Sequence, residues 1–333
     1  MQHLESRKRD HIDLALKSQT GIPEMDRRFH YEPMLQAHPE GGLQPFTFLG
    51  KTHRVPMWVS SMTGGTKMAG TINRNLAAAC NEFGMGMGLG SCRIIMEDDT
   101  YFEDFNMRGI IGDQLPFWAN LGIAQIEELV AGNKVSEATK LVEKLRADGL
   151  IIHVNPMQEW FQPEGDILSH PPLETIKRFM DQFRLPVIVK EVGQGMGPGS
   201  LRQLLQLPLQ AIEFAAFGGT NFARLELMRN ENAERELFEP LSYVGEDVYS
   251  MLDYVNRIVS SETTACKELI ISGGVKTFLD GYYLVRTSLL PAVYGMASTF
   301  LKYAREDYEQ LRRYVHTQVK GLEMAYAFLT VNP

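Results

Sequence analysis

Short apolar runs, separated by longer stretches with helical spacing, recur along the whole chain. Each run is bounded by turn-forming or polar residues, which is typical of a buried strand. Their starts are separated by 30, 32, 33, 36, 25, 58 and 23 residues. The eight predicted strands are 55–60, 85–89, 117–121, 150–154, 186–192, 211–215, 269–272 and 292–294.

Most intervals between these runs carry apolar residues at i, i+3 and i+4, which predicts amphipathic helices. The clearest of them are 72–83, 135–148, 173–183 and 248–261, and a long C-terminal helix is expected over 305–329. Strands that alternate with helices in this way predict an α/β protein, a (β/α)8 TIM barrel. A doubly wound sheet is the alternative, because the number of strands alone does not close a barrel.

Residues 1–333 are expected to form a single barrel domain. Residues 1–50 precede the first strand and contain several prolines and glycines, so we expect them to wrap the barrel. The longest interval contains 230–246, which is rich in Asn and Glu. We interpret 221–265 as an insertion between the sixth and seventh strands that forms a mobile loop or lid.

Composition and charge exclude several classes of protein. Hydrophobic residues make up 44% and charged residues 22%, as in an ordinary soluble globular protein. A net charge of −8 argues against nonspecific binding to nucleic acid or to an anionic membrane. The three cysteines have no CxxC spacing, which favours reduced thiols in a cytoplasmic protein. The charged N-terminus has no apolar segment of a secretory signal, and no apolar run is long enough to span a membrane.

The richest candidate chemistry follows the fourth predicted strand. Polar groups at the carboxyl end of such a strand are where barrel enzymes hold their catalytic residues. The Glu159 carboxylate beside Gln158 could hold a hard cation such as Mg²⁺. The polar cluster consists of His153, Asn155, Gln158, Glu159, Gln162, Glu164 and Asp166.

Other strand ends are rich in glycine and small residues, which allow a ligand to approach the backbone closely. Residues 60–66 could face a flat ligand or form an ordinary turn. Arg93 could clamp a phosphate or could simply be solvated. Gly273–Gly274 and 295–298 follow the seventh and eighth strands, where many barrels bind phosphate through backbone amides.

Two further residues and the basic N-terminal segment each have two possible interpretations. Lys190 lies inside an apolar run, and a buried lysine needs a partner. That partner is either an internal carboxylate such as Glu191 or an anionic ligand ring, and we favour the ligand. Asn120 either hydrogen-bonds the edge of a heterocycle or caps a turn. The basic N-terminus is either solvated or binds a second phosphate, which requires it to fold over the barrel mouth or onto a neighbouring subunit.

Taken together and in this order, the motifs resemble the type 2, flavin-dependent isopentenyl-diphosphate isomerases. The resemblance runs over nearly the whole chain, and its motifs are specific jointly, although each is weak alone. The matching segments are 7–8 with 10–11, 61–65, 90–93, 120–122, 153–159, 162–166, 190–193, 218–220 and 272–274.

The resemblance implies an FMN-binding barrel that converts isopentenyl diphosphate to dimethylallyl diphosphate in isoprenoid biosynthesis. It implies reduced FMN and Mg²⁺ as cofactors, NADPH as reductant, and a cytoplasmic homo-oligomer, a tetramer or octamer. The implied flavin-binding residues are Met62, Thr63, Gly64, Ser91, Asn120, Lys190 and Thr220, with Gly273, Gly274, Val275, Ala297 and Ser298 at the phosphate. The implied substrate-binding residues are Arg7, Lys8, Ser91, Arg93, His153, Asn155 and Gln158. His153 and Gln158 are also the candidate catalytic residues, and Glu159 is the candidate Mg²⁺ ligand.

Four segments depart from the family pattern, mostly on the flavin side. Cys92 stands where the family has Gln, and 213–217 replaces Asp-x-Ser-Gly-Arg, which removes a hydroxyl and an arginine. The family's Trp-Gly-Ile-Pro-Thr is replaced by 241–245, and its Leu-Gly-Ala by 289–291. The diphosphate-binding residues are intact, so the pattern indicates a divergent subfamily.

Two other functions remain open at this point. An FMN-dependent 2-hydroxy-acid oxidoreductase would use the same fold, but that chemistry needs a histidine near the sixth strand end. Residues 217–220 contain no histidine, which argues against it. The altered flavin-side motifs leave a third possibility, an FMN-binding barrel that has lost isomerase activity.

Overall fold

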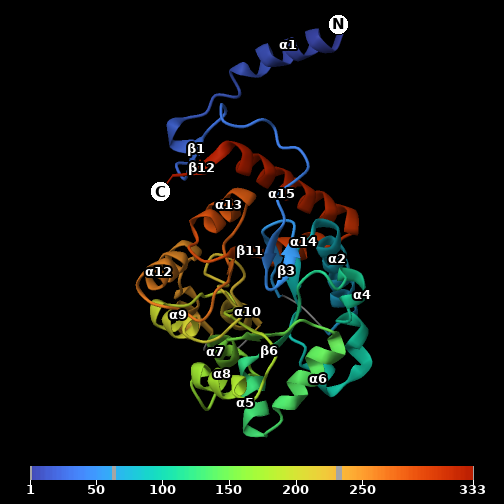
Figure 1. Ribbon diagram of the computed structural model, residues 1–333, viewed down its shortest axis with the longest axis vertical. Helices are drawn as coiled ribbons and strands as arrows, with labels where there is room; N and C mark the ends of the chain where they lie inside the picture. Colours follow the sequence, from blue (N-terminus) through green and yellow to red (C-terminus); the bar gives the residue numbers. More distant parts are fainter. Residues whose placement is uncertain (1, 62–64, 230–234, 333) are drawn as a thin grey trace.

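Eight parallel strands close into a barrel in the computed structural model, which describes residues 2–61, 65–229 and 235–332 (Figure 1). Every strand overlaps one of the predicted runs, so the barrel is confirmed and the doubly wound sheet is wrong. The strands are β4 (Met57–Val59), β5 (Gly86–Gly88), β6 (Phe117–Gly122), β7 (Leu150–His153), β8 (Val187–Lys190), β9 (Ala211–Glu213), β10 (Leu269–Ser272) and β11 (Ala292–Met296).

The strands follow one another around the barrel in chain order, and β11 closes it against β4. At the closure Tyr294 is the register partner of Met57, and Gly295 is the partner of Trp58. All neighbours are parallel, so the carboxyl ends of the eight strands meet at one mouth of the barrel.

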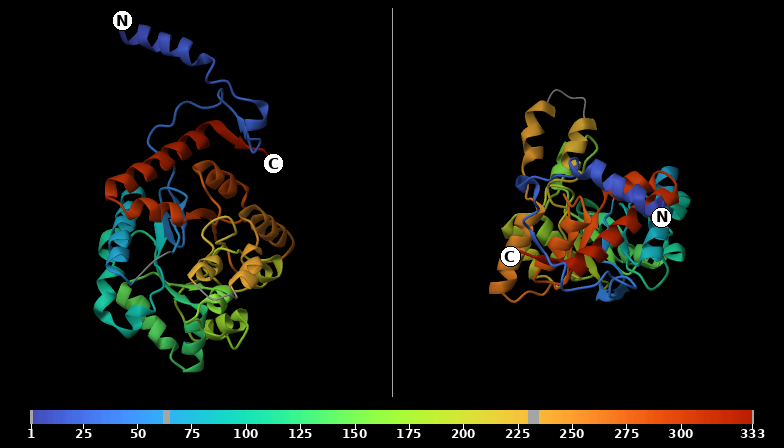
Figure 2. Two further views of the ribbon diagram at one scale, coloured as in Figure 1. Left: turned by 180° about the vertical axis from the view of Figure 1, so that it is seen from behind. Right: turned by 90° about the horizontal axis from the view of Figure 1, so that it is seen from above.

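Helices surround the barrel and cover the outer faces of the strands (Figures 1 and 2). The predicted helix over 248–261 has those bounds in the structure, where the Asp247 side chain caps its first turn. The longer helices are α2 (Lys67–Phe83), α5 (Ile123–Ala131), α6 (Val135–Leu145), α8 (Pro172–Met180), α9 (Pro198–Leu205), α12 (Val248–Ser261), α13 (Phe278–Thr287), α14 (Ser298–Ala304) and α15 (Tyr308–Phe328). Shorter helical segments are α3 (Ile94–Glu97), η2 (Asp99–Asp104), α4 (Arg108–Ile111) and α7 (Pro156–Phe161).

The barrel interior is filled at its amino end by large apolar side chains. A hairpin of β2 (Phe46–Phe48) and β3 (Lys51–His53) closes this end, with Phe48 and Leu49 buried in the same cluster. A second, larger core lies between the strands and the surrounding helices. The interior cluster also contains Trp58, Trp118, Ile151, Ile188, Ala211, Ile270 and Val293. This filled base leaves only the carboxyl end of the barrel open for a ligand.

The N-terminal segment contacts the barrel only in part. Strand β1 (Phe29–Tyr31) pairs antiparallel with the C-terminal β12 (Leu329–Val331). Helix α1 (Gln2–Ala15) stands away from the barrel, and η1 (Ile22–Glu24) lies on the connection between them (Figures 1 and 2). The side chains of residues 5–15 are exposed.

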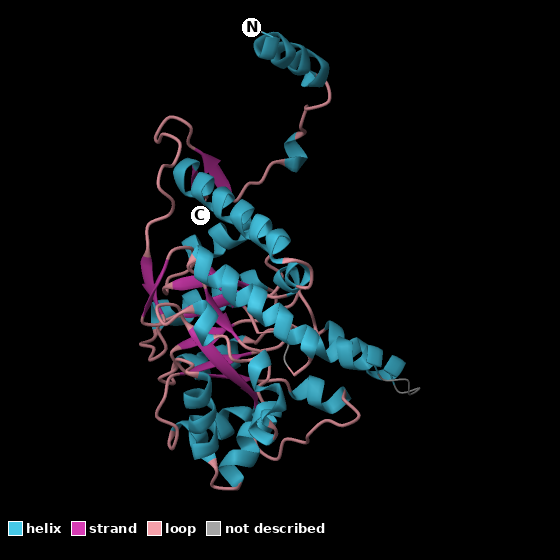
Figure 3. Ribbon diagram, turned by 90° about the vertical axis from the view of Figure 1, so that its right-hand side faces the viewer, coloured by secondary structure: helices cyan, strands magenta, loops and turns pink. Residues whose placement is uncertain are grey.

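The segment between β9 and α12 carries α10 (Phe222–Arg229), α11 (Arg235–Phe238) and η3 (Glu239–Tyr243). Helix α10 leads outward to the grey trace (Figure 3). Residues 230–234, within the expected lid, lie outside the described residues. None of the helices in the described ranges is both long and apolar enough to cross a membrane.

Candidate active site

A ring of polar side chains lines the carboxyl mouth of the barrel. His153, Lys190 and Glu213 are successive register partners on β7, β8 and β9. Asn120 on β6 and Ser272 on β10 extend the ring to either side, where Asn120 contacts His153 and Ser272 contacts Glu213. Side chains alternate between the faces of a strand, so these residues share the inward face with the apolar cluster below them.

A cavity of about 390 Å³ opens at this mouth. The loops that follow β10 and β11, the seventh and eighth strands of the barrel, both line it. The predicted residues that line it are Lys190, Thr220, Gly273, Gly274, Val275, Ala297 and Ser298. Lys276 and Thr299 also line it and were not predicted. The predicted residues Met62, Thr63 and Gly64 lie outside the described residues.

The cavity is shaped by bare backbone and by polar atoms that have no protein partner. A Cβ atom on Gly273 would lie 2.1 Å from the backbone nitrogen of Ala216, and its φ of +91° suits only glycine. Among the described residues, three buried cavity-lining atoms have no hydrogen-bond partner: Ser60 Oγ, Ser61 Oγ and Glu213 Oε2. Such groups are costly to bury unless a ligand or water satisfies them.

Lys190 is 5% exposed and donates from Nζ to the backbone oxygen of Glu191 at 2.8 Å. The Glu191 carboxylate points elsewhere: its Oε2 accepts hydrogen bonds from the backbone nitrogens of Gly193, Gln194 and Gly195 at 2.6–2.8 Å. The alternative in which that carboxylate partners the lysine is therefore wrong. An ammonium group donates up to three hydrogen bonds, so Lys190 retains donors at the cavity.

His153 is held in one tautomer. Asn120 donates from Nδ2 to Leu89 O at 2.9 Å, so Asn120 Oδ1 is an acceptor. His153 Nδ1 lies 2.7 Å from that oxygen and therefore carries the proton. Burial, together with the charge of Lys190, lowers the pKa of His153 to about 3. The ring is thus neutral near pH 7, with Nε2 as an acceptor close to Gly122.

Helix α7 holds the predicted metal ligand. Asn155 donates from Nδ2 to Glu159 Oε1 at 2.9 Å and to Gln158 Oε1 at 3.2 Å. Glu159 Oε2 accepts from the backbone nitrogen of Asp166 at 2.9 Å. Among the described residues no group of three acidic, His or Cys side chains is arranged to hold a metal ion. A cation at Glu159 would therefore need ligands from a bound substrate or water.

Glu226 on α10 is a candidate that was missed from the sequence. It is 3% exposed and accepts a hydrogen bond from Gln158 Nε2 at 3.2 Å, and it pairs with Arg229. Helical spacing in the sequence could have identified it, because Ala223, Glu226 and Leu227 lie on the buried face of α10. A carboxylate at such a position is unusual and indicates a specific partner.

The remaining predicted residues lie around this centre or away from it. Arg93 pairs with Asp166 at 3.0 Å, which places it beside the α7 cluster. Ser91 is exposed at the end of β5. Arg7 and Lys8 are exposed on α1, which stands off the barrel, so they do not reach the site of their own chain (Figure 2).

Solved structures with this fold include flavoproteins. A mandelate oxidase with an FMN adduct aligns with a TM-score of 0.57 at 14% identity, over 99% of this chain and 100% of that chain. The flavin-binding domain of baker's yeast flavocytochrome b2 aligns with a TM-score of 0.60 at 12% identity, over 90% of this chain and 71% of that chain. At such identities the likeness establishes the fold alone.

Sequence relatives are closer. Proteins named isopentenyl-diphosphate delta-isomerase from several organisms are similar to this chain, and three of them serve as examples. The Rickettsia felis protein is 31% identical over 96% of this chain and 90% of its own length. The Deinococcus radiodurans protein is 31% identical over 97% of this chain and 93% of its own length. The Nostoc protein is 33% identical over 91% of this chain and 85% of its own length. No family model matches the sequence. On these relatives, the chain belongs to the type 2 isopentenyl-diphosphate delta-isomerase family, as a divergent member.

Proposed function

We propose that this protein converts isopentenyl diphosphate to dimethylallyl diphosphate, using reduced FMN and Mg²⁺, in isoprenoid biosynthesis. The observation that carries the proposal is the meeting of two different surfaces at one barrel mouth. One is a cavity with bare glycine backbone and unpartnered buried polar atoms. The other is the cluster of amide and carboxylate groups on α7.

The cavity suits FMN in shape and chemistry. The glycine-containing loop 273–275 and the residues Ala297 and Ser298 would hold the phosphate, with Lys276 beside them. Lys190 and Thr220 line the cavity and would contact the ring system. Asn120 and Ser91 are not part of that lining, and their proposed place at the edge of the ring rests on the family resemblance. When bound in its reduced form, FMN would supply the group that donates a proton to the terminal alkene carbon and removes one from the allylic carbon, with N5 the expected atom.

The diphosphate would lie against Arg93, His153 and Asn155. Mg²⁺ typically binds one or two carboxylates together with substrate phosphates, so a single carboxylate at Glu159 is sufficient on the protein side. Asn155 Oδ1 is buried and has no hydrogen-bond partner among the described residues. That amide oxygen is a further acceptor for the cation or its water.

His153 binds the diphosphate rather than acting as the base. In the unliganded protein its Nε2 is an acceptor, which a phosphate oxygen would repel. A neighbouring anion favours the protonated ring and raises its pKa, after which Nε2–H can donate to the diphosphate.

Gln158 is positioned by two hydrogen bonds, from Asn155 to its oxygen and from its nitrogen to Glu226. An amide is a weak acid and base, so Gln158 itself orients the substrate. Glu226 accepts a hydrogen bond from Gln158 Nε2, so it is a carboxylate that could hold a proton beside the substrate.

Arg7 and Lys8 are available to a second copy of the chain, because α1 carries them away from their own barrel. We propose that α1 completes the diphosphate site of a neighbour within a homo-oligomer, a tetramer or octamer. The buried, unpaired cysteines suit a reducing cytoplasm, where NADPH is available as the reductant.

An anaerobic assay separates this function from its alternatives. We expect dimethylallyl diphosphate to form when isopentenyl diphosphate, reduced FMN and Mg²⁺ are all present, and no flavin reduction by mandelate or lactate. Flavin reduction by either hydroxy acid would favour the oxidoreductase. Bound FMN with neither activity would indicate a barrel without isomerase function.

A Glu159→Gln variant tests the metal site. The neutral amide keeps the hydrogen bond to Asp166 but loses the charge that attracts Mg²⁺, so the Mg²⁺ concentration for half-maximal rate should rise about tenfold or more. Glu164→Gln, whose parent side chain pairs with Arg229, is the control and should leave it unchanged. Equal Mg²⁺ dependence in the wild type and Glu159→Gln would remove Glu159 from the metal site.

A further inference from the structure

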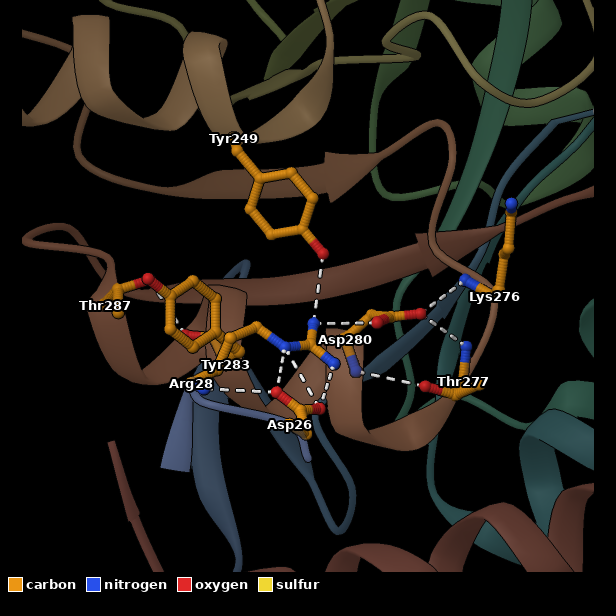
Figure 4. A network of polar contacts seen from close by, with 8 residues as sticks. All are labelled: Asp26, Arg28, Tyr249, Lys276, Thr277, Asp280, Tyr283 and Thr287. Carbon is orange, nitrogen blue, oxygen red and sulfur yellow. Dashed lines mark hydrogen bonds and ion pairs between the residues drawn. The ribbon is translucent and has the colours of Figure 1, made fainter. Parts of the chain in front are cut away.

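Arg28 lies in a dense polar network that extends to Lys276, a residue of the cavity lining (Figure 4). Its guanidinium makes a two-pronged ion pair with Asp26, with Nε–Oδ1 at 2.9 Å and Nη2–Oδ2 at 2.7 Å. Its Nη1 donates to Asp280 Oδ1 at 2.8 Å and to Tyr249 OH at 3.1 Å. The guanidinium carbon also lies 5.6 Å from the centre of the Tyr283 ring. These contacts join residues 26–28 to α12 and α13.

The second oxygen of Asp280 holds a loop of the cavity. Asp280 Oδ2 accepts hydrogen bonds from the backbone nitrogens of Lys276 at 3.0 Å and Thr277 at 2.9 Å. Thr277 Oγ1 in turn accepts from Asp280 N at 3.2 Å, which completes a capping box at the start of α13. The residues directly before this box, Gly273–Lys276, line the cavity.

Asp280 without Arg28 would be unfavourable for an anionic ligand. Asp280 does not line the cavity, but its carboxylate accepts hydrogen bonds from the backbone of Lys276 and Thr277, and an uncompensated negative charge so close to the loop would repel a phosphate. Hydrogen bonds to Arg28, Lys276 and Thr277 lower the pKa of Asp280 in spite of its burial, so the carboxylate stays ionised. Arg28 therefore offsets part of the negative charge of Asp26 and Asp280, and it fixes the Asp280 side chain at the same time.

The network also anchors the N-terminal segment. The backbone oxygen of Arg28 accepts a hydrogen bond from Asn332 N at 2.8 Å, beside the β1–β12 pair. Asn332 Nδ2 donates to Arg27 O at 3.0 Å. The chain that leads to α1 thus leaves the barrel from a point fixed to the back of the 273–277 loop.

We propose that Arg28 is a positioning residue for phosphate binding: through Asp280 it holds the 273–277 loop in a shape and charge state that accept the phosphate of the flavin. Arg28 does not touch the ligand. The inference rests on the proposed function, because that proposal identifies the ligand as FMN. It assigns a role in ligand binding to a residue of the N-terminal segment that lies outside the cavity.

The test compares FMN with riboflavin, which has the same ring system but no phosphate. Dissociation constants are measured by flavin fluorescence quenching for the apo forms of the wild type, Arg28→Met and Arg28→Lys. A lost charge-assisted contact should weaken FMN binding by Arg28→Met about tenfold or more, with riboflavin binding changed less than about twofold. Arg28→Lys should recover part of the loss because it restores the charge without the two-pronged geometry.

Two controls separate positioning from a general loss of structure. Arg27→Met removes a neighbouring exposed arginine with the same charge and should leave both affinities unchanged. In an Asp280→Asn background, Arg28→Met should weaken FMN binding less than about threefold, because the side chain that contacts the loop backbone is then uncharged. Equal losses of FMN and riboflavin affinity, or an undiminished loss in the Asp280→Asn background, would overturn the inference.

Hydrogen exchange separates this inference from the proposed function. In the unliganded protein, the amides of Lys276 and Thr277 should exchange faster in Arg28→Met than in the wild type and Arg27→Met. If the wild type does not bind FMN, the proposed function fails, whereas unchanged exchange at these two amides would contradict the role of Arg28 by itself.

Discussion

Buried ionisable side chains lie at both ends of the barrel, with opposite roles. At the carboxyl mouth, Lys190 and Glu213 line the cavity and are available to a ligand, and His153 is the register partner of Lys190. At the amino end, His53 is fully buried between Phe46 and Phe48, with ring centres 5.6 Å and 5.5 Å away. His53 therefore affects the stability of the closed amino end of the barrel and not the chemistry at the carboxyl mouth.

His53 makes the folded state sensitive to acid. Burial lowers the pKa of His53 from 6.5 to about 4. The unfolded chain therefore takes up a proton first, so stability is complete above pH 6.5 and is lost as pH falls toward 4. We expect a loss of about 2 kcal/mol from this group between pH 7.5 and 5. Urea unfolding at the two pH values measures it.

The His53→Leu variant provides the comparison, because leucine cannot titrate and fits an apolar site. Its unfolding free energy should depend less on pH than that of the wild type, by the same amount of about 2 kcal/mol. His153 is present in both proteins, so its own contribution cancels. An unchanged pH dependence in His53→Leu would contradict this account of the base.

Glu226 is the second residue-scale test. Glu226→Gln keeps an acceptor for Gln158 Nε2 but removes the charge and the pair with Arg229. If Glu226 holds a proton during turnover, kcat should fall about hundredfold while KM changes much less. Steady-state rates measure both. The control is Glu236→Gln, which changes an exposed carboxylate and should leave kcat and KM unchanged. A change in KM alone for Glu226→Gln would show that Glu226 acts in substrate binding and not in proton transfer.

Single residues were predictable where they broke a strong local pattern. Lys190 stands out because it interrupts an apolar strand, and the structure shows it buried with donors toward the cavity. Glu226 does not stand out, because its helix lies in a polar segment whose amphipathic spacing covers only two turns. Its partner Gln158 is 68 positions away, and no local pattern reports such a contact.

Elements follow the same rule. The barrel strands were predictable because all eight are buried on both faces and read as continuous apolar runs. The β2–β3 hairpin was missed, because its strands have three residues each and only one face is buried. The N-terminal helix was also missed, since α1 buries no described side chain and therefore has no apolar stripe.

The hairpin is a stability element that should be separable from the site. Phe48 is fully buried in the interior cluster, so Phe48→Ala should cost about 3–5 kcal/mol of unfolding free energy. FMN affinity should change less than about twofold, because the cavity lies at the opposite end of the barrel. Chemical denaturation and flavin titration measure the two effects. Phe46→Ala, at a partly buried position, should cost clearly less, and equal costs would argue against the hairpin as a packed base.

At the scale of the whole molecule, α1 extends away from the barrel, with Arg7 and Lys8 exposed (Figures 1 and 3). If these residues complete a neighbour's site, two inactive chains should complement each other. One chain carries Arg7→Ala with Lys8→Ala, and the other carries Glu159→Gln. Co-expression should restore up to about a quarter of wild-type activity. The reason is that only some sites combine an intact Glu159 on one chain with an intact α1 from its neighbour. If the two chains co-purify as an oligomer but no activity returns, Arg7 and Lys8 of α1 do not complete the site of a neighbouring chain.

The most direct test of the account counts product molecules per reduced flavin. Moving a double bond involves no net oxidation, so the flavin should return to its starting state after each turnover. The protein is loaded anaerobically with one equivalent of reduced FMN, with Mg²⁺ and excess isopentenyl diphosphate, and dimethylallyl diphosphate is followed by proton NMR. We predict many product molecules per flavin, with the flavin still reduced at the end. Product limited to one molecule per flavin, or flavin oxidised in step with product, would contradict the proposed isomerase mechanism.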